Sequence, residues 1–274
     1  MKLSQILLEP LYHYLKRVRA VTIGTIRQKE EYSLLVRPQY AYGLLKAADI
    51  AKYFGKRKTT VCEFGVATGN GLYNMIDLAE KISSETGVEF RIVGFDTGEG
   101  LPEVYGYKNH PEFWAQGDYP MTNKEKLIEK IENRAELILG DIKNTVNSFI
   151  NSCDPTAPIG FISVDVDIYT SAKDSLNCLL GSPEIYNPAV SIYFDDITHF
   201  FANKWCGELA AIEEFNNENE FRKIDQDRSQ RHTEKKWFEK MYTCHILDHD
   251  VRNKPQSDNQ IRSMYSGLPI GVFK

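Results

Sequence analysis

Four aspartates stand at the ends of two apolar segments of this 274-residue chain. Asp165 and Asp167 close the segment FISVDVD, and Asp195 and Asp196 close the segment SIYFDD. Short, nearly continuous apolar runs are typical of strands that are covered on both faces of a parallel sheet. If the two strands are neighbours, the four carboxylates converge at one sheet edge, where their mutual repulsion favours a bound cation. A hard divalent metal prefers such oxygen ligands.

A simpler interpretation of the same aspartates stays open. Carboxylates that follow strands are also common as solvated loop starts, or as helix N-terminal charges stabilised by the helix dipole. Asp165 and Asp167 lie two positions apart, so they are expected to project to the same side of an extended chain. The residues alone therefore predict either a metal site or a cluster of surface charges.

A glycine-rich turn precedes the aspartates. The segment EFGVATGNG, from Glu63 to Gly71, follows an apolar run and precedes a helical pattern. Glycines at such a turn allow a ligand to approach the backbone closely, and the helix N-terminus offers free N–H donors. Asp96 closes the next apolar run, where an acid can accept both hydroxyls of a ribose. The turn and Asp96 together predict a nucleoside-containing cofactor.

Two cofactor classes fit this arrangement. The spacing of Gly65, Gly69 and Gly71, with Tyr169 and Lys173 four residues apart downstream, is compatible with a short-chain NAD(P)-dependent oxidoreductase. Glu63, however, suits a positively charged ligand end better than a pyrophosphate. S-adenosylmethionine has no phosphate and carries both a sulfonium and an ammonium group. We therefore favour S-adenosylmethionine and keep the oxidoreductase as the alternative.

The surrounding pattern predicts the elements that position these residues. Strands are expected at 60–64, 90–95, 136–139, 160–166 and 190–194, with closing strands at 220–224 and 241–247. Helices are expected at 40–53, 72–83, 124–133, 142–151, 171–180 and 207–217. Alternating strands and helices indicate an α/β fold with a parallel sheet, whose ligands bind at the carboxyl ends of the strands. The aromatic loop at 97–122 is expected to act as a lid, and Arg37, Tyr40 and Tyr42 are expected to pack and cap the first helix.

Charge, cysteine content and the N-terminal segment limit the binding partners and the compartment that we expect. A net charge of −5 argues against a nucleic-acid surface. Five widely spaced cysteines suit buried, reduced thiols in a cytoplasmic protein rather than disulfides. Glu9, Pro10 and His13 interrupt the apolar start, so we expect no signal peptide or transmembrane segment there, but a docking helix that provides a homodimer contact.

The motifs together resemble the macrocin O-methyltransferase family, the metal-dependent class I methyltransferases that act on sugar hydroxyls of natural products. The resemblance rests on EFGVATGNG, FDTGEGLPE, the Gly140-Asp141 step, VDVDIYTSAKDSL and YFDDI, in family order over roughly residues 60 to 215. It implies a Rossmann-like fold, with a mostly parallel seven-stranded sheet, helices on both faces and an N-terminal helical extension. The implied divisions are an extension at 1–39, a methyltransferase domain at 40–250 and a tail at 251–274.

The resemblance also implies roles for individual residues. The cofactor would be held by Glu63, Gly65, Val66, Thr68, Gly69, Asp96, Thr97, Asp141 and Ile142, with the methionine end at Glu63 and the ribose at Asp96. Asp165, Asp195 and Asp196 would hold Mg²⁺ or another divalent cation, and Asp167 would be the general base. Independently of the resemblance, His199, three residues past the aspartate pair, is an alternative base. The implied acceptor is a hydroxyl group of a small molecule, such as a sugar or another polyhydroxylated natural product.

Overall fold

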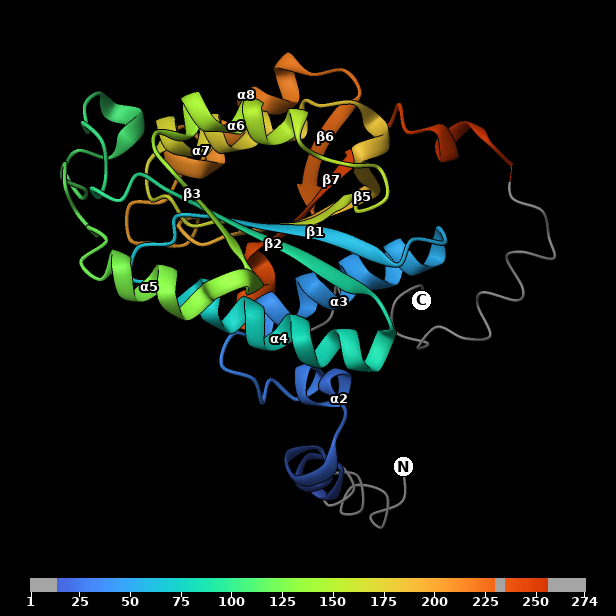
Figure 1. The fold of residues 1–274 in the computed structure, drawn as a ribbon. Coiled ribbons are helices and arrows are strands. Elements are labelled where there is room, and N and C mark those ends of the chain that lie inside the picture. Colours follow the sequence, from blue (N-terminus) through green and yellow to red (C-terminus); the bar gives the residue numbers. More distant parts are fainter. Residues whose placement is uncertain (1–13, 230–234, 256–274) are drawn as a thin grey trace, which may run out of the picture.

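A seven-stranded sheet forms the centre of the molecule in the computed structural model, which describes residues 14–229 and 235–255. The strand order is β3-β2-β1-β4-β5-β7-β6. The first five are mutually parallel, and β7 runs antiparallel to β5 and β6 (Figure 1). The strands are β1 (Lys58–Phe64), β2 (Glu89–Asp96), β3 (Glu136–Leu139), β4 (Ile159–Val164), β5 (Tyr186–Phe194), β6 (Arg222–Gln226) and β7 (Met241–Ile246).

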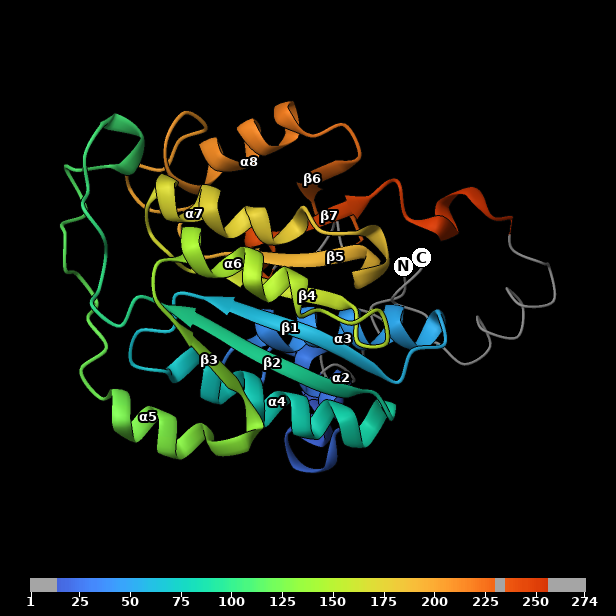
Figure 2. The ribbon, with the colours of Figure 1, turned by 45° about the horizontal axis from the view of Figure 1, so that its top comes forward.

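Helices cover both faces of this sheet. The α-helices are α2 (Ile26–Glu31), α3 (Pro38–Tyr53), α4 (Asn70–Thr86), α5 (Lys124–Ile131), α6 (Ile142–Asn151), α7 (Tyr169–Leu176) and α8 (Gly207–Glu218). Short 3₁₀ turns are η1 (Tyr107–Asn109), η2 (Glu132–Arg134), η3 (Asn177–Leu179), η4 (Pro183–Ile185), η5 (Lys236–Lys240) and η6 (Asp250–Asn253). In Figures 1 and 2, α3 and α4 lie against one face of the sheet, and α6, α7 and α8 lie against the other.

The two covered faces explain why the central strands are almost wholly apolar. Every residue of β4 is buried, and in β1 only the first residue is exposed. On the α6 side, Phe64 stacks on Phe95 with ring centroids 4.4 Å apart. On the α3 side, the fully buried Tyr40 ring meets Phe161 and Tyr193 edge-on. The sheet therefore separates two apolar cores, as the continuous apolar runs predict.

The predicted α/β fold class is confirmed, with small differences at the element ends. The strand predicted at 160–166 ends at Val164. The helix predicted at 171–180 ends at Leu176 and continues as the 3₁₀ turn η3. The two expected closing strands are present as β6 and β7, and β7 pairs antiparallel with both β5 and β6. Such shifts of a few residues are usual at element termini.

A short helical segment precedes the sheet domain. Residues 14–23 and α2 are helical, and Arg27 of α2 forms an ion pair with the buried Asp49 of α3. Residues 1–13 and 256–274, which contain most of the predicted docking helix and tail, lie outside the described residues. Within the described part of the chain, no helix is both long and apolar enough to cross a membrane.

Candidate functional site

A cavity of about 340 Å³ lies at the carboxyl edge of the parallel strands. It is lined by eleven of the thirteen residues that the sequence singled out: Glu63, Gly65, Val66, Thr68, Asp96, Thr97, Ile142, Asp165, Asp167, Asp195 and Asp196. The long loop after β2, in green in Figure 2, lies at this same edge. The topology therefore gathers the glycine turn and the aspartates into one cavity.

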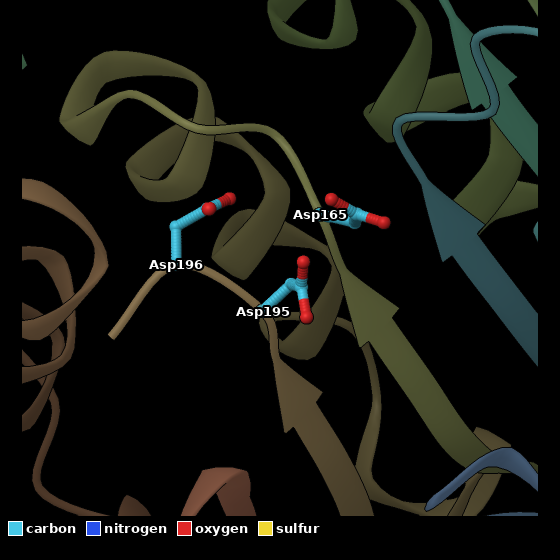
Figure 3. A group of neighbouring side chains, drawn as sticks. All are labelled: Asp165, Asp195 and Asp196. Carbon is cyan, nitrogen blue, oxygen red and sulfur yellow. The ribbon is translucent and has the colours of Figure 1, made fainter. Parts of the chain in front are cut away.

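Three of the aspartates form a compact cluster. Asp165 follows β4, and Asp195 and Asp196 follow the neighbouring β5 (Figure 3). Each offers one carboxylate oxygen, and these three oxygens all lie within 4.8 Å of one another. Oδ2 of Asp196 is buried and has no hydrogen-bond partner. Three hard oxygen donors with one unsatisfied atom suit a divalent cation such as Mg²⁺.

The charges of this cluster oppose one another. Burial and the neighbouring Asp195 and Asp196 raise the pKa of Asp165 to about 7. Burial, Asp167 and Asp195 raise the pKa of Asp196, while Lys240 and a backbone hydrogen bond from Asp167 lower it. Lys240 forms an ion pair with the cluster, between its Nζ and Oδ1 of Asp195 at 3.1 Å. A bound cation would relieve the repulsion that the positive charges of Lys240 and Arg37 leave uncompensated.

Asp167 stands apart from the three clustered aspartates. The expectation that Asp165 and Asp167 share one side of an extended chain is wrong, because β4 ends at Val164 and Asp167 has a left-handed backbone with φ of +64°. Its side chain still lines the cavity. Burial, followed by the charges of Asp165, Asp195 and Asp118, raises its pKa. A carboxylate with a raised pKa beside a cavity can accept a proton near neutral pH.

The glycine turn brings a buried carboxylate to the cavity. Glu63 is almost fully buried, and Tyr40 donates a hydrogen bond from its hydroxyl to Oε1 at 2.6 Å. The other oxygen, Oε2, is buried without a partner. Burial raises the pKa of Glu63 to about 8, although the Tyr40 hydrogen bond acts in the opposite direction. An ammonium group would satisfy the unpaired oxygen.

Two glycines keep this part of the cavity open. Gly65 has a φ of +88°, and a side chain there would overlap the backbone oxygen of Asp165. A Cβ atom on Gly71 would lie 1.9 Å from Oε1 of Glu63. A larger residue would therefore clash with the Asp165 backbone at position 65 or with the Glu63 carboxylate at position 71. The turn therefore needs glycine for close approach.

Asp96 joins the end of β2 to the glycine turn. Its Oδ2 accepts hydrogen bonds from the backbone N–H groups of Val66 and Ala67 at 2.9 and 2.8 Å. Its Oδ1 accepts one from Gly98 at 2.6 Å. The carboxylate thus fixes the turn as well as lining the cavity. Free lone pairs remain on its two oxygens for a ligand hydroxyl.

Two predicted cofactor residues do not line the cavity. Gly69 is the N-cap of α4, with a φ of +87°. Asp141 is exposed, and its side chain caps α6 by accepting a hydrogen bond from the N–H of Lys143. Their neighbours Thr68 and Ile142 do line it. Gly69 and Asp141 therefore shape the local backbone.

The loop after β2 covers the aspartate end of the cavity. Trp114, Asp118 and Tyr119 from this loop line the cavity. The Phe113 ring stacks on His199, which follows β5, with centroids 5.0 Å apart and an interplanar angle of 7°. His199 does not line the cavity, and burial lowers its pKa. The geometry therefore favours Asp167 over His199 as a proton acceptor.

Tyr169 and Lys173, the pair that suggested an oxidoreductase, contact Glu214 of α8 and not the cavity. Tyr169 donates a hydrogen bond from its hydroxyl to Oε2 of Glu214 at 2.5 Å, and Nζ of Lys173 lies 2.9 Å from the same atom. Neither residue lines the cavity. Both serve the contact between α7 and α8.

Sequence reasoning missed two residues that hold the aspartate cluster. Glu208, in the first turn of α8, is buried and accepts a hydrogen bond from the N–H of Asp196 at 3.0 Å. Lys240, from the turn before β7, contacts Asp195. In the sequence Glu208 looks like any acid at a helix start. Only the fold brings it into contact with the aspartate pair.

Comparisons with known proteins agree with the architecture. No protein-family model matches the chain, and no curated protein sequence matches it. A solved structure of the calicheamicin methyltransferase CalS11 is 20% identical, covers 75% of this chain and 78% of its own, and has a TM-score of 0.50. The O-methyltransferase NovP is 17% identical, covers 76% of this chain and 79% of its own, and has a TM-score of 0.49.

A third similar structure is an O-methyltransferase from Bacillus cereus in complex with SAH. It is 14% identical, covers 77% of this chain and 89% of its own, and has a TM-score of 0.41. At such identities the likeness to CalS11 shows the fold. The chain has the predicted Rossmann-like methyltransferase fold.

Proposed function

We propose that this protein is an S-adenosylmethionine-dependent and divalent-metal-dependent O-methyltransferase. Its acceptor is a hydroxyl group of a small molecule, such as a sugar or another polyhydroxylated natural product. One observation carries the proposal: a single cavity joins the Glu63 glycine turn to the Asp165, Asp195 and Asp196 cluster. A cofactor site next to a metal site is what metal-assisted methyl transfer requires.

The residues at the glycine turn fit S-adenosylmethionine. Glu63 offers an unpaired carboxylate oxygen for the ammonium group. Gly65 and Gly71 leave space beside it. Asp96 lies one strand away, where it would hold the ribose hydroxyls. Val66, Thr68, Thr97 and Ile142 would complete the walls, with Gly69 and Asp141 supporting their backbone.

The residues at the neighbouring strand ends fit the chemistry of a hydroxyl acceptor. When bound, S-adenosylmethionine supplies an electrophilic methyl group, and a divalent cation held by Asp165, Asp195 and Asp196 makes a coordinated hydroxyl more acidic. Asp167 would accept the hydroxyl proton as general base. Its place on the cavity wall, outside the three-oxygen cluster, leaves it free for this role.

The lid supports a ring-shaped, hydroxylated acceptor. Trp114 and Tyr119 offer aromatic faces, and Asp118 offers a carboxylate that accepts hydrogen bonds. The fold is shared with a protein named as a calicheamicin methyltransferase. A natural-product sugar could stack on the aromatic rings and donate hydrogen bonds to the carboxylate.

The apolar, exposed side chains Tyr14 and Val18 of the N-terminal helix support a homodimer contact.

Methyl transfer from methyl-labelled S-adenosylmethionine tests the proposal. The purified protein is incubated with magnesium and a panel of free and glycosylated hydroxylated natural products, and label in the product is measured. We expect labelled product that disappears on chelation and in Asp167→Asn. Binding and reduction of a nicotinamide dinucleotide, without any transfer of label, would instead support the oxidoreductase.

A further inference from the structure

Arg37 lines the cavity from outside the motifs. It immediately precedes α3, which begins at Pro38, and its half-buried side chain reaches the cavity wall beside Glu63 and Asp165. Arg37 occupies the N-cap position of α3, as expected, but its side chain makes no capping hydrogen bond. Among the described residues it is the one basic side chain in a lining that contains seven acids.

Arg37 is held in place without being neutralised by a contact. Its guanidinium carbon lies 5.2 Å from the centre of the Tyr40 ring, a cation–π arrangement. No carboxylate in the described part of the chain lies within ion-pair distance of it. Its planar donors are therefore available to a ligand.

Tyr40 contacts both the Glu63 carboxylate and the Arg37 guanidinium, two opposite charges that line the cavity. The Tyr40 hydroxyl donates to Glu63, and the Tyr40 ring lies under Arg37. Ser163 donates a hydrogen bond to the Tyr40 oxygen at 3.0 Å, so the ring orientation is itself fixed. A buried acceptor for an ammonium group and a guanidinium, both in contact with Tyr40 and both lining the cavity, match an α-amino acid, which carries both charges on one carbon.

We propose that Arg37 binds the carboxylate of the methionine portion of the cofactor, while Glu63 binds its ammonium group. This inference rests on the proposed function, because it needs S-adenosylmethionine at the glycine turn. It adds a binding residue from the segment before α3 and assigns a partner to the one free guanidinium of the cavity. The competing role for Arg37 is to offset the charge of Asp165 and Asp195, whatever ligand is bound.

Binding of S-adenosylhomocysteine and of its decarboxylated analogue separates these roles. The two ligands share the adenosine, the sulfur and the amine, and only the first has a carboxylate. Affinities are measured by titration calorimetry on the full chain without an acceptor. The variants are Arg37→Gln and Arg37→Lys, with Arg134→Gln as the matched control, since Arg134 is exposed and pairs with Glu80 away from the cavity.

We expect Arg37→Gln to weaken S-adenosylhomocysteine binding about tenfold or more and to leave the decarboxylated analogue within about twofold of the wild type. Arg37→Lys should recover part of the loss, and Arg134→Gln should change neither affinity. Equal losses for both ligands, or no loss for either, would overturn the inference and leave the proposed function standing. A wild-type protein that binds neither ligand would overturn the proposed function itself, and this inference with it.

Discussion

Glu208 accepts a hydrogen bond from the backbone N–H of Asp196 through Oε2 at 3.0 Å, and its other carboxyl oxygen is buried without a partner. Burial, and then the charge of Asp196, raises the pKa of Glu208 well above its usual range. Burial therefore favours the neutral form of Glu208, and the hydrogen bond to Oε2 holds the backbone of the turn that carries Asp195 and Asp196. Through this hydrogen bond Glu208 positions the aspartate cluster.

Glu208→Gln and Glu208→Ala should differ sharply in stability. Glutamine is neutral and still offers an oxygen to Asp196, so we expect its free energy of unfolding to lie within about 1 kcal/mol of the wild type. Alanine leaves a buried N–H without a partner and opens a cavity, which should cost roughly 2–4 kcal/mol. Urea unfolding of both variants at neutral pH measures the difference. Equal losses would contradict the idea that a neutral oxygen acceptor is sufficient at this position.

The stability of the metal-free protein should fall as pH rises. Burial and mutual repulsion raise the pKa of Asp165 to about 7 and also raise those of Asp167 and Asp196. Between the unfolded value of about 4 and these folded values, the folded state binds more protons than the unfolded state. The stabilising protons are present at low pH and are lost as pH rises through about 7.

Thermal unfolding at a series of pH values, with and without magnesium, checks this dependence. In the presence of chelator, Tm should fall by on the order of 5 °C between about pH 5 and pH 8. Magnesium should raise Tm most at the upper end, where the carboxylates are ionised. In Asp196→Asn the fall with pH should shrink and the magnesium effect should disappear. A magnesium effect that survives this substitution would contradict the proposed ligand set.

The sequence predicts the frame of the molecule well, because buried parallel strands leave an unambiguous pattern. The residues of β4 and β5 are almost all buried, so their apolar runs could be read without knowledge of the fold. Residues at their carboxyl ends, such as Asp165 and Asp195, then follow from the rule that ligands bind at that edge. Most of the candidate site was predictable for this reason.

Residues that reach the cavity from other elements were not predictable in the same way. Arg37 precedes a helix, where local reasoning suggests a cap, yet its side chain turns toward Tyr40 and the cavity. Glu208 occupies a first-turn position at which an acid is ordinarily explained by the helix dipole. The left-handed backbone of Asp167 has no signature in a sequence that reads as a strand end. These are consequences of tertiary packing.

Gly71→Ala should be destabilising although it lies in a helix. Alanine normally favours a helix over glycine by about 1 kcal/mol, but a Cβ atom here would lie 1.9 Å from Oε1 of Glu63 and 3.1 Å from the Tyr40 hydroxyl. We expect a net loss of roughly 1–3 kcal/mol and weaker binding of S-adenosylhomocysteine. In a Glu63→Ala background most of the stability loss should vanish, because the overlapping atom is gone. Additive losses in urea unfolding would contradict the close contact.

Tyr169→Phe tests whether the Tyr169 and Lys173 pair has any part in catalysis. The Tyr169 hydroxyl donates to Glu214, whose pKa is lowered to about 2 by hydrogen bonds from Lys108 first and then from Tyr169. Removing the hydroxyl leaves Glu214 paired with both lysines. The free energy of unfolding should therefore fall by about 0.5–1.5 kcal/mol.

The rate of methyl transfer should respond differently to Tyr169→Phe and to Asp167→Asn. Because Tyr169 does not line the cavity, Tyr169→Phe should keep kcat for methyl transfer within about twofold of the wild type. Asp167→Asn removes the proposed proton acceptor and should lower kcat by roughly 10²–10⁴-fold with little change in S-adenosylhomocysteine affinity. Steady-state assays with the same acceptor measure both. Loss of turnover in Tyr169→Phe with an unaffected Asp167→Asn would move the chemistry from the strand ends to the helix α7 pair, since a general base must touch the group from which it takes the proton.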